Sequence, residues 1–320
     1  MPDLSFRAML KPLDVEEVID VALHRPLAYA ITRIAYPTPI TPDQITWLSM
    51  FVGIAAGAAA WSSFALGAPR MGLAGSLFIL SAVFDCSDGQ LARLRGTSSS
   101  FGRMLDGAVD AVVQAAVVPA AVAHAWWRAG GPSPAAPPAG VALAWMPASL
   151  WVALGALAIV TGLAHTILYD HYKNVYLHLT QPVRKEGDDP EDVAAAWATR
   201  DARPMSVGDW LRFVVARPYL IRQRALFDWI DPHLPARFRD MPAYTPDGAA
   251  RFRAAQRGLM RAWTFYGIGT HIFTLSVAMM FDRVDLYILA RLVLFNGALI
   301  ALVPAQRRAS RAFFTPAAAP

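Results

Sequence analysis

Long apolar segments dominate the chain and alternate with polar connections. Six segments are predominantly apolar over about 20 residues, the length that an α-helix needs to cross a bilayer. They cover residues 46–66, 72–92, 103–127, 141–168, 262–281 and 285–304. The pattern therefore predicts an all-α integral membrane protein with six transmembrane helices.

The connections divide the chain into five expected parts. Residues 1–40 precede the first apolar segment, 41–168 hold the first four and 262–306 hold the last two. The long connection 169–261 is rich in Arg, Asp, Pro and Trp and has only short apolar blocks. We expect it to be a cytoplasmic insertion of one to three helices. Residues 307–320 are expected to form a cytoplasmic tail.

The segment 13–36 carries too many charges to cross a membrane. Leu27, Ile31 and Ile34 recur there at helical spacing, behind Pro26, which suits a first helical position. This pattern predicts an amphipathic helix that lies on the cytoplasmic leaflet. An ordinary linker before the first membrane segment is the alternative.

The distribution of Lys and Arg predicts the orientation. When the long connection is left out, ten of them lie in the N-terminal segment, in the turn 93–102 with the adjoining Arg103, and in the C-terminal tail, against three on the opposite side. Because positive residues remain on the cytoplasmic side, both termini and the turn 93–102 are expected in the cytoplasm. The expected location is the inner, cytoplasmic membrane.

Composition agrees with a membrane protein. Hydrophobic residues make up 55% of the chain and charged residues 17%, against about 25% charged residues in soluble domains. The net charge of +5 is explained by topology and headgroup attraction, so we expect no nucleic-acid partner. The single cysteine, Cys86, excludes an intramolecular disulfide. The first 40 residues show no pattern of a cleavable signal peptide.

Four carboxylates stand where a membrane segment should have almost none: Asp85, Asp88, Asp106 and Asp110. On helices, the first two share one face and the last two share another. The two helices are consecutive and antiparallel, and Asp85 and Asp110 each lie roughly 12 Å from the turn between them. The spacing therefore predicts one carboxylate cluster near the cytoplasmic surface.

Such a cluster needs cations, because neighbouring carboxylates raise one another's pKa strongly. Oxygen ligands select Mg²⁺, Mn²⁺ or Ca²⁺ rather than zinc, and two divalent ions would balance four negative charges. Two metals that bind a diphosphate are a common arrangement for phosphoryl transfer. Gly89 and Ala92 leave a notch beside the carboxylates, and Arg93 adds a guanidinium suited to phosphate.

The full pattern, Asp-x2-Asp-Gly-x2-Ala-Arg-x8-Gly-x3-Asp-x3-Asp, resembles the signature of the CDP-alcohol phosphotransferase (CDP-alcohol phosphatidyltransferase) family. The resemblance extends over about 40–310 except the long connection. The eight fixed positions are Asp85, Asp88, Gly89, Ala92, Arg93, Gly102, Asp106 and Asp110.

The resemblance implies an enzyme of membrane phospholipid biosynthesis. The diphosphate of a CDP-linked donor binds two Mg²⁺ or Mn²⁺ ions, an alcohol attacks the β-phosphorus, and CMP leaves. Asp85, Asp88 and Asp106 are the implied metal ligands, and Asp110 is the implied general base and a further metal contact. Gly89, Ala92, Arg93 and Gly102 are the residues implied to border the CDP moiety.

The resemblance leaves the substrates open. The donor is expected to be CDP-diacylglycerol, with inositol phosphate, glycerol phosphate or serine as the acceptor. The alternative is an enzyme of the CDP-choline or CDP-ethanolamine type, with diacylglycerol as the acceptor. Members of the family often dimerise, so a homodimer is among the expected assemblies.

Two readings of the aspartates do not involve transfer chemistry. One is a cation channel or transporter in which intramembrane Asp residues line an ion path. The other is a polar core in which the carboxylates pair with Arg93, Arg95 and Arg103. Neither calls for the Gly-x2-Ala-Arg notch.

Three weaker signals complete the list of candidate site residues. Thr46 ends a stretch that resembles the family's Thr-Pro-Asn-x-x-Thr entry, with Asp43 in place of Asn, and the alternative is a plain helix start. Asp170 and Lys173 are candidates for the acceptor pocket, or else they anchor the chain at the interface.

The third weak signal is Arg291, inside the last apolar segment. It is a candidate contact for a phosphate-bearing acceptor. The favoured alternative is an ion pair with Asp282 or Asp285, since both acids lie within three helical turns.

Overall fold

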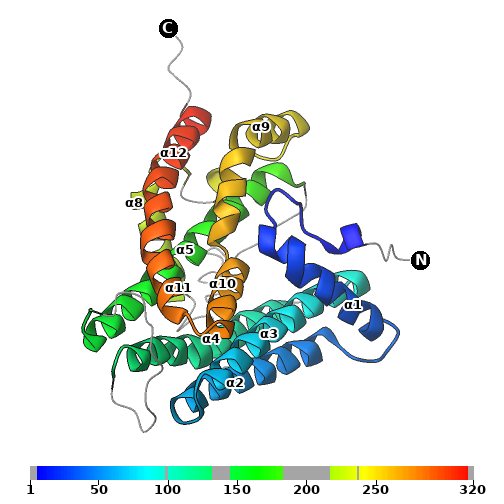
Figure 1. The fold of residues 1–320 in the computed structure, drawn as a ribbon. Coiled ribbons are helices and arrows are strands. Elements are labelled where there is room, and N and C mark those ends of the chain that lie inside the picture. The colour runs from blue at the N-terminus through cyan, green and yellow to red at the C-terminus, as the bar shows by residue number, and fades with distance from the viewer. Residues whose placement is uncertain (1–5, 98–99, 132–144, 183–216, 236–237, 316–320) are drawn as a thin grey trace, which may run out of the picture. The chain divides into compact units, whose positions relative to one another are not determined.

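The computed structural model describes residues 6–97, 100–131, 145–182, 217–235 and 238–315. Every regular element within these ranges is a helix (Figure 1). The chain divides into two compact units. Unit 1 comprises Met1–His165 and Phe265–Gly297, and unit 2 comprises Thr166–Thr264 and Ala298–Pro320.

Unit 1 contains most of the apolar helices. They are α1 (Arg25–Ala35), α2 (Pro42–Leu66), α3 (Ala68–Arg95), α4 (Ser100–Arg128), α10 (Ile268–Met280) and α11 (Val284–Ala290). Unit 2 contains α8 (Arg217–Ile230) and α9 (Pro246–Trp263), and α5 (Ala148–Thr180) and α12 (Asn296–Phe314) contribute to both units. Short 3₁₀ or π turns occupy Phe6–Met9, Asp20–His24, Phe238–Asp240, Thr264–Tyr266 and Arg291–Phe295.

Local sequence signals explain where α2 begins and α3 ends. The Thr41 hydroxyl accepts the N–H of Gln44 at 3.3 Å, while the Gln44 side chain accepts the N–H of Thr41 at 3.0 Å. This capping box, with Pro42 in the first turn, satisfies backbone donors that a helix start leaves open. Gly96 ends α3 at φ 65°, a left-handed conformation that favours glycine. The predicted helix start before the first membrane segment is therefore confirmed.

Five helices are long and apolar enough to cross a membrane by length and composition. They are Pro42–Leu66, Ala68–Arg95, Leu105–Arg128, Ala148–Thr180 and Val284–Phe314. The expected segment 262–281 is interrupted by the turn Thr264–Tyr266, and α10 after it has 13 residues. At about 1.5 Å per residue, that helix is shorter than a bilayer core of about 30 Å. The count of six spans therefore stays a prediction.

Small residues let the helices of unit 1 pack closely. Helix α2 lies against both α3 and α4 (Figure 1). A Cβ atom on Gly57 would lie 2.8 Å from the backbone oxygen of Ala116, and one on Gly53 would lie 2.4 Å from the Val113 side chain. No larger side chain fits at either position, so these glycines fix the contact between α2 and α4.

Helix α1 packs on the end of α3 that carries the aspartates. The Thr32 hydroxyl donates to Gln90 Oε1 at 3.2 Å, and Gln90 Nε2 donates to the carbonyl of Arg25 at 3.1 Å. Leu27 and Ile34 point away from this contact and are 47% and 74% exposed. An exposed apolar face suits a helix on a membrane surface, and the interfacial position stays a prediction.

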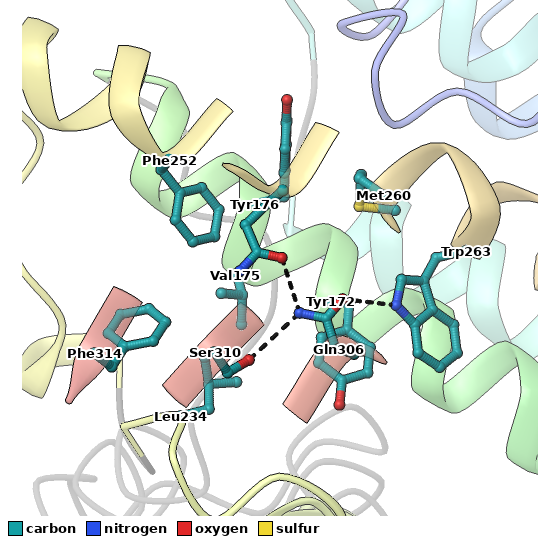
Figure 2. Close-up of a pocket in the computed structure, with 11 residues that line it drawn as sticks. Tyr172, Val175, Tyr176, Leu234, Phe252, Met260, Trp263, Gln306, Ser310 and Phe314 are labelled. Carbon is teal, nitrogen blue, oxygen red and sulfur yellow. Dashed lines mark hydrogen bonds between the residues drawn. The ribbon is translucent and has the colours of Figure 1, made fainter. Parts of the chain in front are cut away.

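Unit 2 has an aromatic interior crossed by a chain of hydrogen bonds (Figure 2). Trp263 Nε1 donates to Gln306 Oε1 at 3.0 Å. Gln306 Nε2 in turn donates to Gln256 Oε1 at 3.1 Å and to Ser310 Oγ at 3.4 Å. These bonds hold α12 against α9. They also explain why polar residues are tolerated in an otherwise apolar interior.

Candidate metal and nucleotide site

Three of the four predicted metal ligands converge in unit 1. Asp85 and Asp88 on α3 and Asp106 on α4 each offer an oxygen, and these oxygens lie within 4.8 Å of one another. We call these three residues the aspartate cluster. The spacing argument predicted this convergence, because helical faces three and four residues apart bring the carboxylates to the same side.

Arg25 interacts electrostatically with Asp85, but no basic side chain pairs directly with the aspartate cluster within the part of the chain that the structure describes. No Lys or Arg there forms an ion pair with Asp85, Asp88 or Asp106. Asp85 Oδ1 is buried and accepts no hydrogen bond. A buried carboxylate oxygen without a partner is costly, so the arrangement calls for a cation.

The nearby arginines contact the N-terminal segment instead. Arg93 Nε donates to the carbonyl of Met9 at 2.9 Å. Arg95 donates to the carbonyls of Ala35, Tyr36 and Thr38 at 3.0, 2.9 and 2.8 Å. Of the three arginines in the polar-core alternative, these two are thus engaged with backbone, and the side chain of Arg103 lies outside the described residues.

Thr46 belongs to the site, as the weak sequence signal suggested. Its hydroxyl lies 2.5 Å from Asp88 Oδ2 and 3.2 Å from the carbonyl of Pro42 one turn earlier. The capping box that starts α2 sets the register that aims Thr46 at Asp88. Thr46 is therefore positioned to orient a carboxylate of the cluster.

Gly89 lies beside the cluster with room around it. A Cβ atom there would meet the Arg93 guanidinium at 3.5 Å, an ordinary contact, so protein packing alone does not require glycine at this position. Ala92 follows on the same face and is half-buried, as is Gly102 in the first turn of α4. The Arg93 guanidinium thus lies directly over Gly89, and the predicted nucleotide notch at this position stays a prediction.

A cavity of about 440 Å³ adjoins the cluster, and Asp85 and Asp110 both line it. Asp110, the predicted general base, therefore faces the same space as a predicted metal ligand. Ser49, Ser81 and Gln114 supply neutral polar groups to the walls. Ser81 and Gln114 lie four residues from Asp85 and Asp110, respectively, on the same helical faces.

The N-terminal segment forms part of the same cavity wall, which sequence reasoning missed. Asp20 and His24 line the cavity, and His24 Nδ1 lies 2.8 Å from Asp20 Oδ1. The spacing of four residues on a helical turn was a usable signal for this pair. Nothing in the sequence placed the pair beside the aspartates, because that contact is made across more than 60 residues.

Glu17 fastens this segment to α10. Its carboxylate accepts the backbone N–H groups of Gly269 and Thr270 at 3.2 and 2.7 Å, and the Thr270 hydroxyl at 3.0 Å. It thereby satisfies donors at the start of α10. Burial, followed by the neighbouring Asp20, raises the pKa of Glu17 to about 8, and the three hydrogen bonds oppose that rise only in part.

The residues present fit a divalent metal ion. The donor set is made of carboxylate oxygens, which suit Mg²⁺ and Mn²⁺. The buried Asp85 Oδ1 without a hydrogen-bond donor is the atom that an ion would satisfy. The predicted choice between the two metals is not decided by this geometry.

The remaining weak candidates have other partners. Asp170 pairs with Lys173 at 2.5 Å, and the Lys173 ammonium lies over the ring of Tyr169. Both candidates belong to unit 2. Their pairing leaves their predicted role at the acceptor untested.

The predicted ion pair of Arg291 with Asp282 or Asp285 is wrong. Arg291 donates to the hydroxyl of Tyr287, one turn earlier on its own helix. Asp285 pairs with Arg283 at 3.1 Å, and Asp282 has partners elsewhere. Proximity in sequence misled the prediction, because both acids are engaged by other partners: Asp285 by Arg283, and Asp282 by His124 and Arg128.

Unit 1 holds a second polar cluster, formed by Ser63, His124, Arg128 and Asp282. His124 lies 2.8 Å from Ser63 Oγ and 2.6 Å from Asp282 Oδ1, and Arg128 pairs with Asp282 at 2.9 Å. The order Ser–His–Asp matches that of hydrolytic triads. Ser63 is fully buried, however, so no substrate reaches it, and we assign the cluster a structural role.

Comparisons with known proteins agree with this site. Residues 39–183, which include the whole aspartate motif, match the family described as CDP-alcohol phosphatidyltransferase. The phosphatidylinositol phosphate synthase of Mycobacteroides abscessus is 38% identical over 106 residues, which are 33% of this chain and 43% of that protein. The bifunctional IPC transferase and DIPP synthase of Rubrobacter xylanophilus is 36% identical over 81 residues, 25% of this chain and 17% of that protein. The matched part therefore spans less than half the length of either relative.

Proposed function

Because residues 39–183 belong to the CDP-alcohol phosphatidyltransferase family, we propose that this integral membrane protein transfers a substituted phosphate from a CDP-linked donor to an alcohol. The observation that carries the proposal is the aspartate cluster, whose buried (Asp88) and half-buried (Asp85, Asp106) acids lie together without an ion pair to a basic side chain in the described chain. A diphosphate held by divalent ions suits this arrangement. A structural core would not leave such acids unneutralised.

Each motif residue has a proposed role. Asp85, Asp88 and Asp106 hold two divalent ions, Mg²⁺ or Mn²⁺, which supply charge neutralisation for the diphosphate when bound. Asp110 accepts the proton of the alcohol, supported by its place on the wall of the adjoining cavity. The oxygen of that alcohol forms the new bond to the β-phosphorus, and the bond from that phosphorus to the oxygen of CMP breaks.

The notch around Gly89 is the proposed place for the CDP moiety. Gly89 and Ala92 allow the nucleotide to approach the backbone, and the Arg93 guanidinium stands beside them. Gly102 borders the same region from the start of α4. The contact of Arg93 with Met9 ties this part of the site to the N-terminal segment.

We favour CDP-diacylglycerol as the donor and a small polar alcohol as the acceptor. The name of the Mycobacteroides relative, a phosphatidylinositol phosphate synthase, supports inositol phosphate as the first acceptor to test. Glycerol phosphate and serine follow. A donor of the CDP-choline type with diacylglycerol as acceptor is the alternative arrangement.

One assay tests the function. Purified protein in detergent with Mg²⁺ or Mn²⁺ and CDP-diacylglycerol should release CMP only when the correct alcohol is present. CDP-choline with diacylglycerol serves as the second donor and acceptor pair. No CMP from any pair would contradict the proposal, and cation flux through liposomes without nucleotide would favour a channel instead.

The cytoplasmic orientation of the site is a proposal of its own. The chain has one cysteine, so a Cys86→Ala background permits labelling of single introduced cysteines. Thr97→Cys and Arg70→Cys are both at exposed positions, the first beside the predicted cytoplasmic turn and the second on the predicted opposite side. In intact cells, an impermeant thiol reagent should label only the cysteine at 70.

A further inference from the structure

The N-terminal segment contributes a buried histidine, His24, to the wall of the cavity beside the aspartate cluster. One ring nitrogen of this histidine has no protein partner. The His24 side chain is fully buried, and Nδ1 lies 2.8 Å from Asp20 Oδ1. Nε2 is buried and makes no hydrogen bond. His24 lines the cavity of about 440 Å³ together with Asp85 and Asp110.

A buried polar atom without a partner is expensive, and most such atoms in folded proteins are hydrogen-bonded. His124 in the same unit follows that rule, because both of its ring nitrogens have partners. His24 is an exception, because its Nε2 has no partner, and it lines the cavity beside the proposed site of transfer. The free nitrogen is therefore placed to meet a ligand.

The hydrogen bond between Asp20 and His24 determines which kind of ligand group can bind Nε2. A carboxylate oxygen accepts hydrogen bonds, so Asp20 fixes the tautomer of His24 in which Nδ1 carries the proton. Nε2 then presents a lone pair, which accepts a hydrogen bond from an O–H group. A phosphate oxygen without a proton offers no such donor.

The rest of the cavity has the same character. Its other neutral polar lining groups are the hydroxyls of Ser49 and Ser81 and the amide of Gln114. No Lys or Arg lines this cavity in the ranges that the structure describes. The remaining polar walls are the carboxylates of Asp20, Asp85 and Asp110. Walls of hydroxyl, amide and carboxylate groups without a basic side chain suit the hydroxyl-bearing part of an alcohol rather than a charged phosphate.

Neighbouring contacts hold the pair in place. A Cβ atom on Gly269 would lie 2.2 Å from Asp20 Oδ1, so α10 presses directly on the Asp20 carboxylate. Glu17, three residues earlier, caps the same helix. Asp20 and His24 are thus a fixed part of the wall and not a loose terminus.

We propose that His24, oriented by Asp20, binds a hydroxyl group of the alcohol acceptor and helps to select a polyhydroxylated acceptor. This inference rests on the proposed transferase function and adds the residues that recognise the acceptor. His24 contacts the substrate, and Asp20 is a positioning residue that acts through it.

The test separates acceptor recognition from donor binding and from folding. CMP release is measured with CDP-diacylglycerol and with inositol phosphate, glycerol phosphate and serine as acceptors. His24→Phe should raise the acceptor KM about tenfold, the effect expected when one buried hydrogen bond is lost, and should leave the donor KM unchanged. His24→Gln, which retains a polar group near the position of Nε2, should restore most of the loss. Asp20→Asn should give a smaller rise in acceptor KM.

A matched control is His271→Phe. His271 is also buried in unit 1, and neither of its ring nitrogens has a partner, but it does not line this cavity. Its acceptor KM should equal that of the wild type. Thermal unfolding in detergent identifies any variant that fails to fold, in which case His24→Gln and Asp20→Asn decide the outcome.

The outcomes are distinguishable. Wild-type protein that releases no CMP with any acceptor overturns the proposed function and this inference with it. Active wild-type protein whose acceptor KM is unchanged in His24→Phe overturns the inference alone. A rise in donor KM without a rise in acceptor KM assigns His24 to the lipid donor and also overturns it.

Discussion

Unit 1 contains two polar clusters that include aspartates. They differ in whether basic or neutral partners contact those aspartates. In the aspartate cluster, Asp85, Asp88 and Asp106 lie together without a basic partner among the described residues, and a cavity adjoins them. In the other cluster, Asp282 lies between His124 and Arg128. A buried carboxylate that is paired, such as Asp282, belongs to the structural core of the fold. Neighbouring carboxylates without ion pairs beside a cavity instead form a site that a ligand can bind.

The largest expected difference is in kcat, between a substitution of the proposed general base and a substitution in the second polar cluster. Asp110→Asn removes the proton acceptor, so kcat should fall by about a thousandfold while CDP-diacylglycerol still binds. Asp282→Asn should leave kcat per folded molecule close to the wild-type value. CMP release and donor binding measure both, and normal turnover in Asp110→Asn would remove that residue from the role of base.

The free energy of unfolding should change in opposite directions when an acid is removed from each of the two clusters. Asp282→Ala leaves Arg128 without its acid, so the free energy of unfolding should fall by about 3–5 kcal/mol. Asp85→Asn in metal-free protein should stabilise instead, because it removes repulsion within the aspartate cluster. Unfolding in detergent with a chelator measures both changes. Equal destabilisation by the two substitutions would show that the clusters do not differ in this way.

The hydroxyl that orients Asp88 offers a finer test. Thr46→Val removes the 2.5 Å contact but keeps the shape of the side chain, so affinity for Mg²⁺ should fall about 10- to 100-fold. Thr46→Ser retains the hydroxyl and is the control. Calorimetric titration with Mg²⁺ measures the affinity, and an unchanged value in Thr46→Val would place the ion away from Asp88.

A methyl group at the notch should affect only the donor. Gly89→Ala makes only an ordinary contact with the Arg93 guanidinium, yet it occupies space proposed for the nucleotide, so the donor KM should rise about tenfold. Gly258→Ala is the matched control, since it also adds a methyl group to a helix with open space around it. Both variants should be at least as stable as the wild type. An unchanged donor KM in Gly89→Ala would exclude the notch as the nucleotide site.

Glu17 gives the smallest and most condition-dependent effect. Since burial beside Asp20 raises its pKa from 4.5 to about 8, the folded protein binds this proton more tightly than the unfolded chain does. The resulting stabilisation is complete below about pH 4.5 and is lost as pH rises through about 8. Glu17→Gln should remain within about 1 kcal/mol of the wild type near pH 4.5 and should lack the decline that the wild type shows as pH rises from there through about 8. Melting temperatures across this range measure the difference, and parallel curves would contradict the assignment.

Sequence spacing predicted the parts of the site that lie on single helices. Carboxylates three or four residues apart share a face, and the short turn placed Asp106 at a depth similar to that of Asp85 and Asp88, so one cluster was expected if the two faces met. The packing of α3 and α4 brings them together. The start of α2 was equally local, since Thr41, Pro42 and Gln44 satisfy the first turn by themselves. These features need no knowledge of distant contacts.

Predictions failed or fell short where the partner comes from elsewhere in the chain. Arg291 donates to Tyr287 rather than to a nearby acid, because Asp285 pairs with Arg283 and Asp282 with His124 and Arg128. The expected segment 262–281 is interrupted at its first turns, and Glu17, more than 250 residues away, caps α10 after the break.

The sequence by itself determined an all-helical membrane chain, the two faces that carry the aspartates and the family whose motif they match. Each of these depends on periodicity or on a local motif. Only the tertiary structure decided that Asp20 and His24 lie in the cavity wall beside Asp85, and that Asp282 pairs with Arg128 and is hydrogen-bonded to His124. The reason is physical: whether a buried polar group is satisfied depends on which distant atoms reach it, and spacing along one helix contains no information about them.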